Sequence, residues 1–395
     1  MKYIVLLGDG MADRPLKEFG GKTPLQVAET PNMDRLAAGG EMGLVRTVPD
    51  SFTPGSDVAN LSVLGYDPVR YFSGRAPLEA ASMGVELGPA DVAFRCNLVT
   101  LQDDKMADFS AGHISTGEAE GLIRAVDAEL SDAEISFYPG VSYRHLMVWR
   151  GGKTGAVCTP PHDISGQPVR EYLPRGTGSE RLNDLMLCSR SVLADHPVNQ
   201  NRVLHGDAPA NSIWLWGQGN RPSLPTFQEK YGVTGGVISA VDLMKGIAIY
   251  AGLKAVHVPG ATGYFDTNFR GKALAALDLL AEDDFVYLHV EAADEAGHIG
   301  DAGEKVRAIE NFDQRVVGEL LQGLPKLGDF RILLLPDHPT PIGIRTHSSD
   351  PAPFVLYDSR NIRESGRRYD EETAAKAGRL VDPGYQIMDL LIREV

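Results

Sequence analysis

The chain has 395 residues, 43% of them hydrophobic, and a formal net charge of −15 at pH 7. The length allows two domains with separate cores, and the hydrophobic content is that of a globular protein and not of a disordered one. The negative charge argues against a general binder of nucleic acids or membrane surfaces, which recruit positively charged proteins, although local arginines or metal ions still allow a small anionic substrate.

An apolar run from residue 3 to residue 7 opens the chain and ends at Gly8-Asp9-Gly10. Such a continuous apolar stretch, closed by a glycine turn, is typical of a strand buried on both faces of a parallel sheet. The run is too short for the core of a signal peptide, and no later one is long enough to cross a bilayer. Three widely spaced cysteines fit a reducing compartment, so we expect a cytoplasmic protein without membrane association.

Two short helices are expected next. Residues 30–40 begin with a polar residue and a proline and end in two glycines, the usual boundaries of a short helix. Ser56 lies in a Thr-Pro-Gly-Ser-Asp turn, and residues 58–65 can continue from it as a second helix. At the first turn of a helix, amide groups and the positive end of the dipole stabilise a nearby phosphate.

The C-terminal third repeats a strand followed by a turn. The expected strands cover residues 285–290, 331–336 and 353–357, with helices at residues 305–324 and 371–378. Alternating strands and helices predict a doubly wound, mostly parallel α/β sheet, whose ligands gather at the carboxyl ends of its strands. Asp9, Asp294 and Asp337 each follow their own expected strand, so we expect the two ends of the chain to build one sheet and one site.

The middle of the chain has more turns and shorter apolar runs than either end. We therefore expect a second α/β domain, inserted into the first at residues 73–262. Residues 1–72 and 263–395 would then form the two parts of the first domain, which carries Asp9, Asp294 and Asp337. No internal repeat or low-complexity segment is apparent in the sequence.

Seven side chains with chemical function stand at the ends of these elements. They comprise three carboxylates, three imidazoles and one hydroxyl: Asp9, Ser56, Asp294, His298, Asp337, His338 and His347. Carboxylate oxygen and imidazole nitrogen suit divalent ions such as Mn, Zn or Co. Seven ligands exceed the need of one tetrahedral ion and suit two ions beside a reactive hydroxyl, which predicts phosphoryl chemistry.

One ligand set is indicated by Asp294, His298 and His347. Asp294 and His298 are four residues apart and would share one side of a helical turn, although Gly297 makes a loop equally compatible. A lone Asp-His pair is usually a surface turn. The recurrence of aspartate after three separate strands favours the metal site over that alternative.

The other set joins Asp9, Ser56, Asp337 and His338. Prolines flank the adjacent Asp337 and His338 and favour a turn, from which both side chains can reach one site. Coordination of the Ser56 oxygen would lower its pKa and make it a nucleophile at neutral pH. The structural alternative for this serine is a simple helix N-cap.

The order of these motifs along the chain resembles the alkaline phosphatase superfamily. Within it, the chain resembles the cofactor-independent (2,3-bisphosphoglycerate-independent) phosphoglycerate mutases, and their compact archaeal-type branch. The resemblance extends over nearly the whole chain and includes the segments 75–80 and 109–114. It implies an alkaline phosphatase-like sheet with an inserted substrate-binding domain.

In that family two divalent ions occupy the positions of the two ligand sets, and the serine matching Ser56 becomes a phosphoserine. The resemblance implies that Ser56 attacks 3-phosphoglycerate, and that the glycerate reorients in a closed cleft and receives the phosphate on its 2-hydroxyl. We expect manganese, with Mg, Zn or Co as alternatives, and no 2,3-bisphosphoglycerate cofactor. The expected partner is a small phosphorylated substrate and neither nucleic acid nor membrane, while self-association stays open.

The inserted domain offers candidates for contact with the substrate. His113 is the best general acid or base by resemblance, with a satisfied loop histidine as its alternative. His162 and Asp163 resemble the turn that orients the substrate in the family. Four cations are candidates for binding the carboxylate or phosphate, with solvated surface residues as the alternative: Arg75, Arg144, Arg202 and Lys245.

The metal motifs do not identify the carbon skeleton of the substrate. A homoserine kinase-like phosphotransferase of the same branch, a phosphopentomutase and a phosphatase remain alternatives, as does a metal-stabilised scaffold without turnover. Glu291 stands near a position where a basic residue is expected in archaeal mutases. The sequence has no glycine-rich phosphate loop followed by Lys-Ser/Thr, which disfavours the usual nucleotide site.

Overall fold

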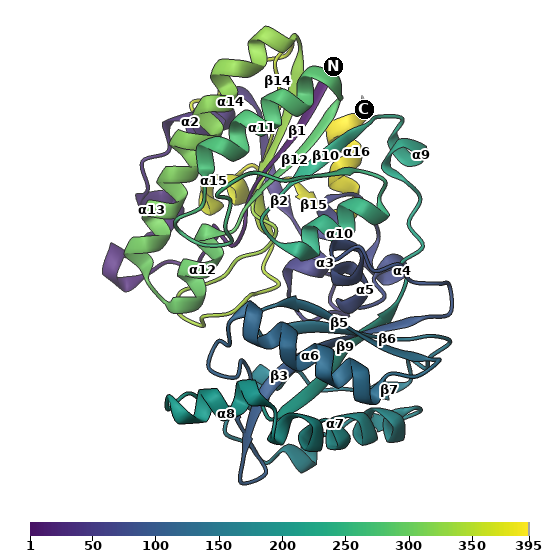
Figure 1. The fold of residues 1–395 in the computed structure, drawn as a ribbon. Helices are drawn as coiled ribbons and strands as arrows, with labels where there is room; N and C mark the ends of the chain where they lie inside the picture. Colours follow the sequence, from purple (N-terminus) through teal and green to yellow (C-terminus); the bar gives the residue numbers. More distant parts are fainter. Residues whose placement is uncertain (394–395) are drawn as a thin grey trace. The chain divides into compact units, whose positions relative to one another are not determined.

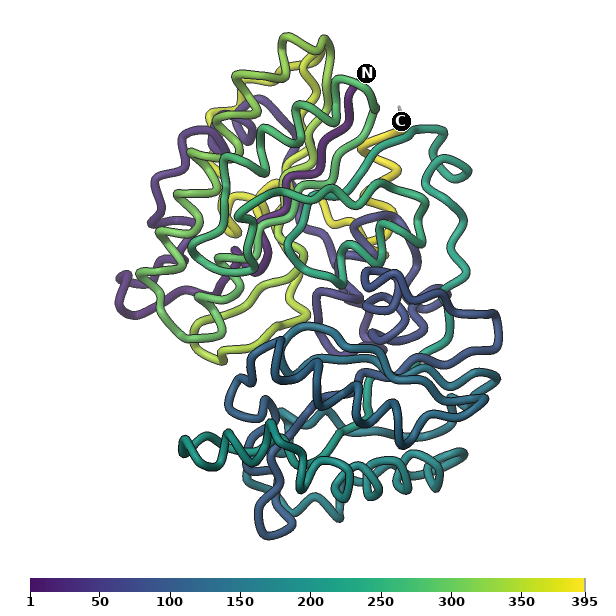
Figure 2. The backbone as a smooth tube through the Cα atoms, viewed as in Figure 1, coloured from purple at the N-terminus to yellow at the C-terminus, as the bar shows by residue number. Residues whose placement is uncertain are grey.

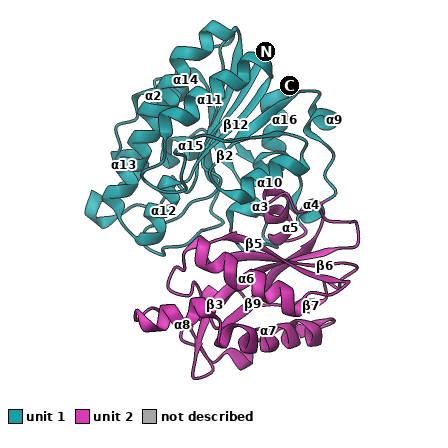
Figure 3. Ribbon diagram, viewed as in Figure 1, with its two compact units in different colours: residues 1–72, 223–395 teal, residues 73–222 magenta. Residues whose placement is uncertain are grey.

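The computed structural model describes residues 1–393, and the chain divides into two compact units (Figure 3). Unit 1 comprises residues 1–72 together with the chain from residue 223 onward, and unit 2 comprises residues 73–222. The sequence interpretation extended the insertion to residue 262. The structure places residues 223–262 in unit 1, because two strands from this stretch pair within the sheet of that unit.

Unit 1 is built on one sheet of eight strands, in the order β11-β10-β12-β1-β13-β14-β2-β15. The strands are β1 (Lys2–Gly8), β2 (Glu41–Val45), β10 (Gly235–Ile238), β11 (Lys254–Val256), β12 (Phe285–Val290), β13 (Phe330–Leu335), β14 (Ala352–Asp358) and β15 (Leu380–Val381). Strand β14 runs antiparallel to both of its neighbours, and the other described pairs are parallel. The prediction of a mostly parallel α/β sheet is confirmed.

Strand β1 lies between β12 and β13, so the two ends of the chain do form one sheet (Figure 2). The N-terminal segment, purple in Figure 2, runs between segments from the C-terminal third. Residues 4–7 of β1 are completely buried, as is nearly all of β12. Their continuous apolar sequences explain this burial, since a central parallel strand is covered on both faces.

Helices cover both faces of this sheet (Figure 1). One face carries α2 (Pro31–Gly39), α11 (Phe269–Glu282), α13 (Ala302–Phe312), α14 (Gly318–Gly323) and α15 (Glu371–Lys376), and the other carries α3 (Ser56–Val63), α10 (Asp242–Tyr250) and α16 (Ile387–Ile392). The helix predicted at residues 305–324 is interrupted by a π-helical turn over Asp313–Val317. Shorter helices are α1 (Pro24–Val27), α4 (Pro68–Tyr71), α9 (Phe227–Tyr231) and α12 (Ala292–Ile299).

Unit 2 contains a five-stranded antiparallel sheet. Its strands are β3 (Val92–Gln102), β4 (Lys105–Asp108), β5 (Ile135–Val141), β6 (Arg144–Trp149) and β9 (Ser212–Asn220), beside a small pair of β7 (Ala156–Val157) and β8 (Arg175–Gly176). Helices α6 (Thr116–Leu130) and α7 (Ser179–Ala194) pack on one face, α5 (Ala76–Ser82) packs on the other, and α8 (Pro197–Leu204) follows α7. Among residues 1–393, no helix combines the length and apolarity needed to span a membrane.

The two ends of unit 2 lie side by side. The hydroxyl of Ser73 donates to the backbone oxygen of Asn220 across 2.6 Å. Gly74 has a φ of +131°, and a Cβ there would lie 2.1 Å from the backbone oxygen of Gln218. A side chain at Gly74 is therefore excluded both by backbone conformation and by space.

Candidate metal centre

The seven predicted ligands gather where the central strands of unit 1 end. Asp9 directly follows β1, and Asp337 and His338 lie in the turn after β13. Asp294 and His298 lie on α12, which follows β12. Of the two conformations expected for this segment, the structure therefore has the helix and not the loop. The remaining two are Ser56, the first residue of α3, and His347, in the segment before β14.

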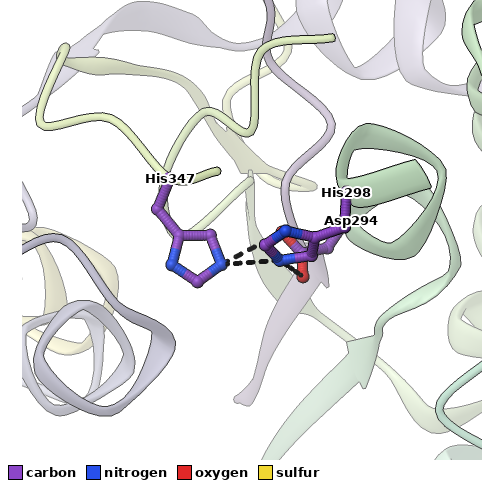
Figure 4. A group of neighbouring side chains, drawn as sticks. All are labelled: Asp294, His298 and His347. Carbon is purple, nitrogen blue, oxygen red and sulfur yellow. Dashed lines mark hydrogen bonds and ion pairs between the residues drawn. The ribbon is translucent and has the colours of Figure 1, made fainter. Parts of the chain in front are cut away.

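Asp294, His298 and His347 form the first group, shown in Figure 4. The Nε2 atom of His298 lies 3.1 Å from Oδ2 of Asp294, and Nε2 of His347 lies 3.5 Å from Oδ1. The two Nε2 atoms are 3.0 Å apart. Three lone-pair donors that face one another at this spacing form a site into which one divalent ion fits.

The second group is centred on His338, whose Nε2 lies 3.1 Å from Oγ of Ser56. The same nitrogen lies 3.3 Å from Oδ2 of Asp337 and 3.7 Å from Oδ1 of Asp9. Potential ligand atoms of Asp9, Asp294 and His338 also lie within 4.8 Å of one another. The two groups therefore adjoin through Asp294, a contact that the sequence did not indicate.

Gly10 allows the loop after β1 to approach α12. Its φ is +63°, and a Cβ at this position would lie 2.6 Å from Cα of Asp294 and 2.7 Å from Oγ1 of Thr340. Its amide donates to Oδ1 of Asp337 across 3.3 Å. The residue after Asp9 must therefore be glycine for these carboxylates to converge.

The electrostatics of the cluster fit bound cations. Burial, followed by the charges of Asp337 and Asp294, raises the pKa of Asp9 well above its usual range. The buried Oδ1 of Asp9 has no hydrogen-bond partner within the described part of the chain. Burial lowers the pKa of His338, which favours the neutral ring that metals require. A divalent ion would neutralise the carboxylates and would bind Oδ1 of Asp9, which otherwise has no partner among the described residues.

Two neighbouring side chains were not predicted as site residues. His289 on β12 places Nε2 3.0 Å from Oδ2 of Asp9. Asn60 on α3 donates to Oδ2 of Asp337 across 2.7 Å. The sequence does show His289 as a histidine inside an otherwise apolar strand. The apolar pattern by itself assigns such a residue to the core and not to a site.

A basic group also lies beside Glu291, supplied by a residue distant in sequence. Lys272 on α11 places Nζ 2.8 Å from Oε2 of Glu291, and both side chains are buried. Burial by itself raises the pKa of Glu291, but the charges of Lys272 and His289 outweigh it and hold that pKa well below its ordinary value. Glu291 is therefore an ionised member of a buried network.

In unit 2, several predicted substrate residues share one aromatic cluster. Tyr143 lies between His113, with ring centroids 6.2 Å apart, and the guanidinium of Arg144, 5.7 Å from its ring. Phe109 contacts both Tyr143 and His162, at ring-centroid distances of 5.9 Å and 6.0 Å. His113 has a φ of +51°, a left-handed conformation that is uncommon for residues other than glycine.

The same cluster continues to Arg75 through residues that were not predicted as site residues. The rings of His162 and Trp216 are 5.3 Å apart, and Arg95 lies over Trp216 at 4.4 Å. Glu79 pairs with Arg95 at 2.9 Å and with Arg75 at 3.1 Å. Burial lowers the pKa of Arg95 to about 10, so it stays a cation at neutral pH. Guanidinium and imidazole groups are therefore brought together within unit 2.

The other predicted substrate residues have different surroundings. Asp163 lies 3.6 Å from the neighbouring ring of His162. The guanidinium of Arg202 is buried and donates to two backbone carbonyls and to a carboxylate on α6, which supports a structural role. Lys245 on α10 belongs to unit 1, where Nζ lies 3.0 Å from Asp242.

Known proteins match nearly the whole chain. A family model described as 2,3-bisphosphoglycerate-independent phosphoglycerate mutase matches residues 37–199. A relative from Geobacter sulfurreducens, named as a probable enzyme of that kind, is 57% identical over 99% of this chain and 100% of its own. A mutase from Methanosarcina acetivorans is 56% identical over 96% of each chain.

Solved structures share the fold. A protein from Pyrococcus horikoshii superposes with a TM-score of 0.84 at 30% identity, over 99% of this chain and 97% of the other. The cofactor-independent phosphoglycerate mutase from Thermoplasma acidophilum superposes with a TM-score of 0.67 at 29% identity, over 100% of this chain and 99% of the other.

The mostly parallel sheet carries carboxylates and imidazoles at its strand ends. These features define a class, that of α/β enzymes with a site suited to divalent metal ions. Within that class, 57% identity over 99% of the chain decides the family. The chain belongs to the 2,3-bisphosphoglycerate-independent phosphoglycerate mutases, which are isomerases. The resemblance indicated by the order of the motifs is confirmed.

Proposed function

We propose that the chain interconverts 3-phosphoglycerate and 2-phosphoglycerate through a phosphoserine at Ser56. The observation that carries the proposal is the position of Ser56 Oγ, at the first residue of α3 and 3.1 Å from Nε2 of His338. The names of the relatives support this activity over the homoserine kinase, phosphopentomutase and phosphatase alternatives.

The proposed reaction has two balanced steps. Oγ of Ser56 attacks phosphorus in line, so that the Oγ–P bond forms, the bond from phosphorus to the 3-oxygen breaks, and the proton of Oγ passes to the departing 3-oxygen through a general acid-base group. The 2-hydroxyl then attacks phosphorus of the phosphoserine, so that the bond from the 2-oxygen to phosphorus forms, the Oγ–P bond breaks, and the proton of the 2-hydroxyl passes to Oγ of Ser56 through a general acid-base group. The phosphoryl group on Ser56 comes from the substrate and returns to the same glycerate, so a 2,3-bisphosphoglycerate cofactor is not required.

We assign the two ligand groups to two divalent ions. Asp294, His298 and His347 would hold one, and Asp9, Ser56, Asp337 and His338 the other. When bound, the ions would lower the pKa of the serine hydroxyl and neutralise charge on the phosphoryl group. Mixed oxygen and nitrogen donors favour Mn over the softer metals, with Mg, Zn or Co as alternatives.

The chain itself prepares Ser56 for attack. The amide groups in the first turn of α3 and the positive end of its dipole can stabilise phosphoryl oxygens close to Oγ. The N-cap residue is Gly55, whose extended backbone lets the chain enter the helix directly before the serine.

A cytoplasmic location is part of the proposal, supported by cysteines that are free thiols: Cys96, Cys158 and Cys188.

The substrate roles of His113, Arg75, Arg144, His162 and Asp163 stay predictions from the resemblance. Their support is the single cluster that Arg75, His113, Arg144 and His162 form within unit 2. An imidazole there suits proton transfer, and guanidinium groups suit a carboxylate or a phosphate.

The test compares wild-type protein with Ser56→Ala. Metal-free protein is loaded with Mn and given 3-phosphoglycerate, and 2-phosphoglycerate is followed by coupling to enolase, with homoserine plus ATP supplied in a parallel reaction. Ser62→Ala is the matched control, because Ser62 is a buried serine of the same helix. We expect turnover in wild type and Ser62→Ala, none in Ser56→Ala, and a phosphorylated Ser56 peptide in quenched wild-type reactions.

Three results would contradict the proposal. Undiminished turnover in Ser56→Ala would rule out a phosphoserine intermediate at Ser56. Activity only with homoserine and ATP would identify a kinase. Free phosphate as the main product from 3-phosphoglycerate would identify a phosphatase.

A further inference from the structure

Behind Asp9 runs a buried row of alternating basic and acidic side chains. Nζ of Lys272 lies 2.8 Å from Oε2 of Glu291, and Oε1 of Glu291 lies 3.0 Å from Nδ1 of His289. Nε2 of His289 lies 3.0 Å from Oδ2 of Asp9. The side chains of all four are at most 5% exposed, so water does not screen these contacts.

Neighbouring groups fix each member of the row. The hydroxyl of Ser239 donates to Oε1 of Glu291 across 2.9 Å, and the amide of Ala240 donates to the same oxygen across 3.2 Å. Lys272 also donates to the backbone oxygen of His289 across 2.9 Å. His289 is therefore held at its ring, which contacts Glu291 and Asp9, and at its backbone oxygen, which accepts from Lys272.

The row determines which oxygen of Asp9 is free. Oδ2 is occupied by His289, whereas the buried Oδ1 has no hydrogen-bond partner among residues 1–393. Oδ1 is also the oxygen that lies 3.7 Å from Nε2 of His338, inside the second ligand group. The ring of His289 lies between the two carboxylates, with Nδ1 facing Oε1 of Glu291 and Nε2 facing Oδ2 of Asp9.

We propose that His289, held by Glu291 and Lys272, is a positioning residue that fixes Asp9 with one carboxylate oxygen presented to the second metal ion. The inference rests on the proposed function for the assignment of Asp9 as a ligand. It gives a role to the side chains of Glu291 and of its partner Lys272, which connect to Asp9 through His289. Groups that orient metal ligands from behind typically change metal affinity by about 10- to 100-fold when they are removed.

The test measures metal binding and not turnover. Metal-free wild type, His289→Leu and His289→Gln are titrated with Mn by calorimetry, and thermal unfolding is followed in EDTA. We expect two ions in wild type, and in His289→Leu an affinity about 10- to 100-fold weaker for one ion only. His289→Gln keeps one donor that can reach Asp9, so it should retain more affinity than His289→Leu.

Two further variants keep the inference falsifiable if His289→Leu does not fold. Glu291→Gln preserves the shape of the row but removes its charge, and it should weaken the same single ion to a smaller extent. Asp313→Asn is the control, because Asp313 is a buried carboxylate that instead binds the N-terminal turn of α2 at Met33 and Asn32. The control should lose stability and keep both Mn affinities.

Unchanged Mn affinities in His289→Leu or Glu291→Gln would overturn the inference, as would an equal loss of both ions in the folded variants. Failure of the proposed function looks different. A wild-type protein that binds two ions but does not interconvert phosphoglycerates would remove the mutase assignment, while a selective loss of one ion in His289→Leu would still support the positioning role.

Discussion

The side-chain amide of Asn60 donates to Oδ2 of Asp337 across 2.7 Å, and it donates as well to the backbone oxygen of Ser56 across 2.8 Å. The hydroxyl of Tyr287 in turn donates to Oδ1 of Asn60 across 2.6 Å. Asn60 and Tyr287 are both completely buried. One amide thus joins a candidate ligand to the turn that carries the proposed nucleophile, and a tyrosine on β12 fixes the orientation of that amide.

Tyr287→Phe tests this connection. Removal of the hydroxyl leaves Oδ1 of Asn60 buried without a donor, which should lower the free energy of unfolding by about 1–3 kcal/mol. Because Asn60 then orients Asp337 and Ser56 less firmly, we also expect turnover to fall about tenfold. Urea denaturation and the enolase-coupled assay provide the two measurements.

Tyr369→Phe is the matched control for that variant. Tyr369 is also almost completely buried, and its hydroxyl donates to the backbone oxygen of Pro353 across 3.0 Å and not to a residue of the cluster. It should lose a similar amount of stability with no change in turnover. Equal effects of the two substitutions on turnover would show that Asn60 does not position the site.

The sequence made Asp9, Asp294 and Asp337 predictable because each follows a continuous apolar run, and parallel strands bring their carboxyl ends to one edge. Asn60 and His289 were not predicted because their partners are distant in the sequence: Tyr287 is 227 residues from Asn60, and Asp9 is 280 residues from His289. Periodicity carries no information on such pairs.

The predicted C-terminal boundary of the inserted domain, at residue 262, was wrong for a different reason. Strands β10 and β11 have only four and three residues, and their flanks are rich in turns, so they resemble the inserted segment in composition. Only the pairing of β10 with β12, and of β11 with β10, assigns them to the sheet of unit 1. The direction of β14 was equally hidden, because an apolar run predicts a strand but not its orientation.

Lys305 forms a buried ion pair beneath the cluster, and its removal should strongly destabilise the protein. Nζ lies 2.7 Å from Oδ2 of Asp13 and donates to the backbone oxygens of Ala12 and Thr340 across 3.1 Å and 2.8 Å. Lys305→Met leaves Asp13 buried and unpaired, so the free energy of unfolding should fall by about 3–5 kcal/mol. Urea denaturation at neutral pH measures the loss.

The double variant Asp13→Leu/Lys305→Met separates charge from packing. Removal of both charges should restore part of the stability, because no unpaired ion is left, although the carbonyl groups that Lys305 bound stay without a donor. A double variant less stable than Lys305→Met would show that Asp13 contributes more through packing than through its charge.

Metal binding should release a proton. His298 forms a hydrogen bond with Asp294, which raises the pKa of His298 to about 9 although burial partly opposes this shift. The ring is therefore protonated at neutral pH in the metal-free protein. An ion requires the neutral ring, and the apparent affinity for Mn should therefore fall as the pH drops below about 9. Calorimetric titrations in buffers of different ionisation enthalpy measure the released proton, and heats that do not depend on the buffer would contradict the assignment of His298.

Glu371 should make stability depend on pH. Its carboxylate accepts from the hydroxyl of Thr23 across 2.6 Å and from the amide of Asp13 across 3.0 Å, yet burial raises its pKa from 4.5 to about 7. The folded chain then binds this proton more tightly than the unfolded chain. The contribution is fully present below about pH 4.5 and is lost as the pH rises through about 7, up to about 3 kcal/mol.

Glu371→Gln removes that dependence while it keeps both hydrogen bonds possible. The free energy of unfolding of the variant minus that of wild type should be small at about pH 5 and should rise by up to about 3 kcal/mol at about pH 8. Glu372→Gln is the control, since Glu372 is exposed and pairs with Lys376. Its difference from wild type should show no such rise. A Glu371→Gln difference that is equal at the two pH values would show that Glu371 is ionised in the folded protein throughout this range.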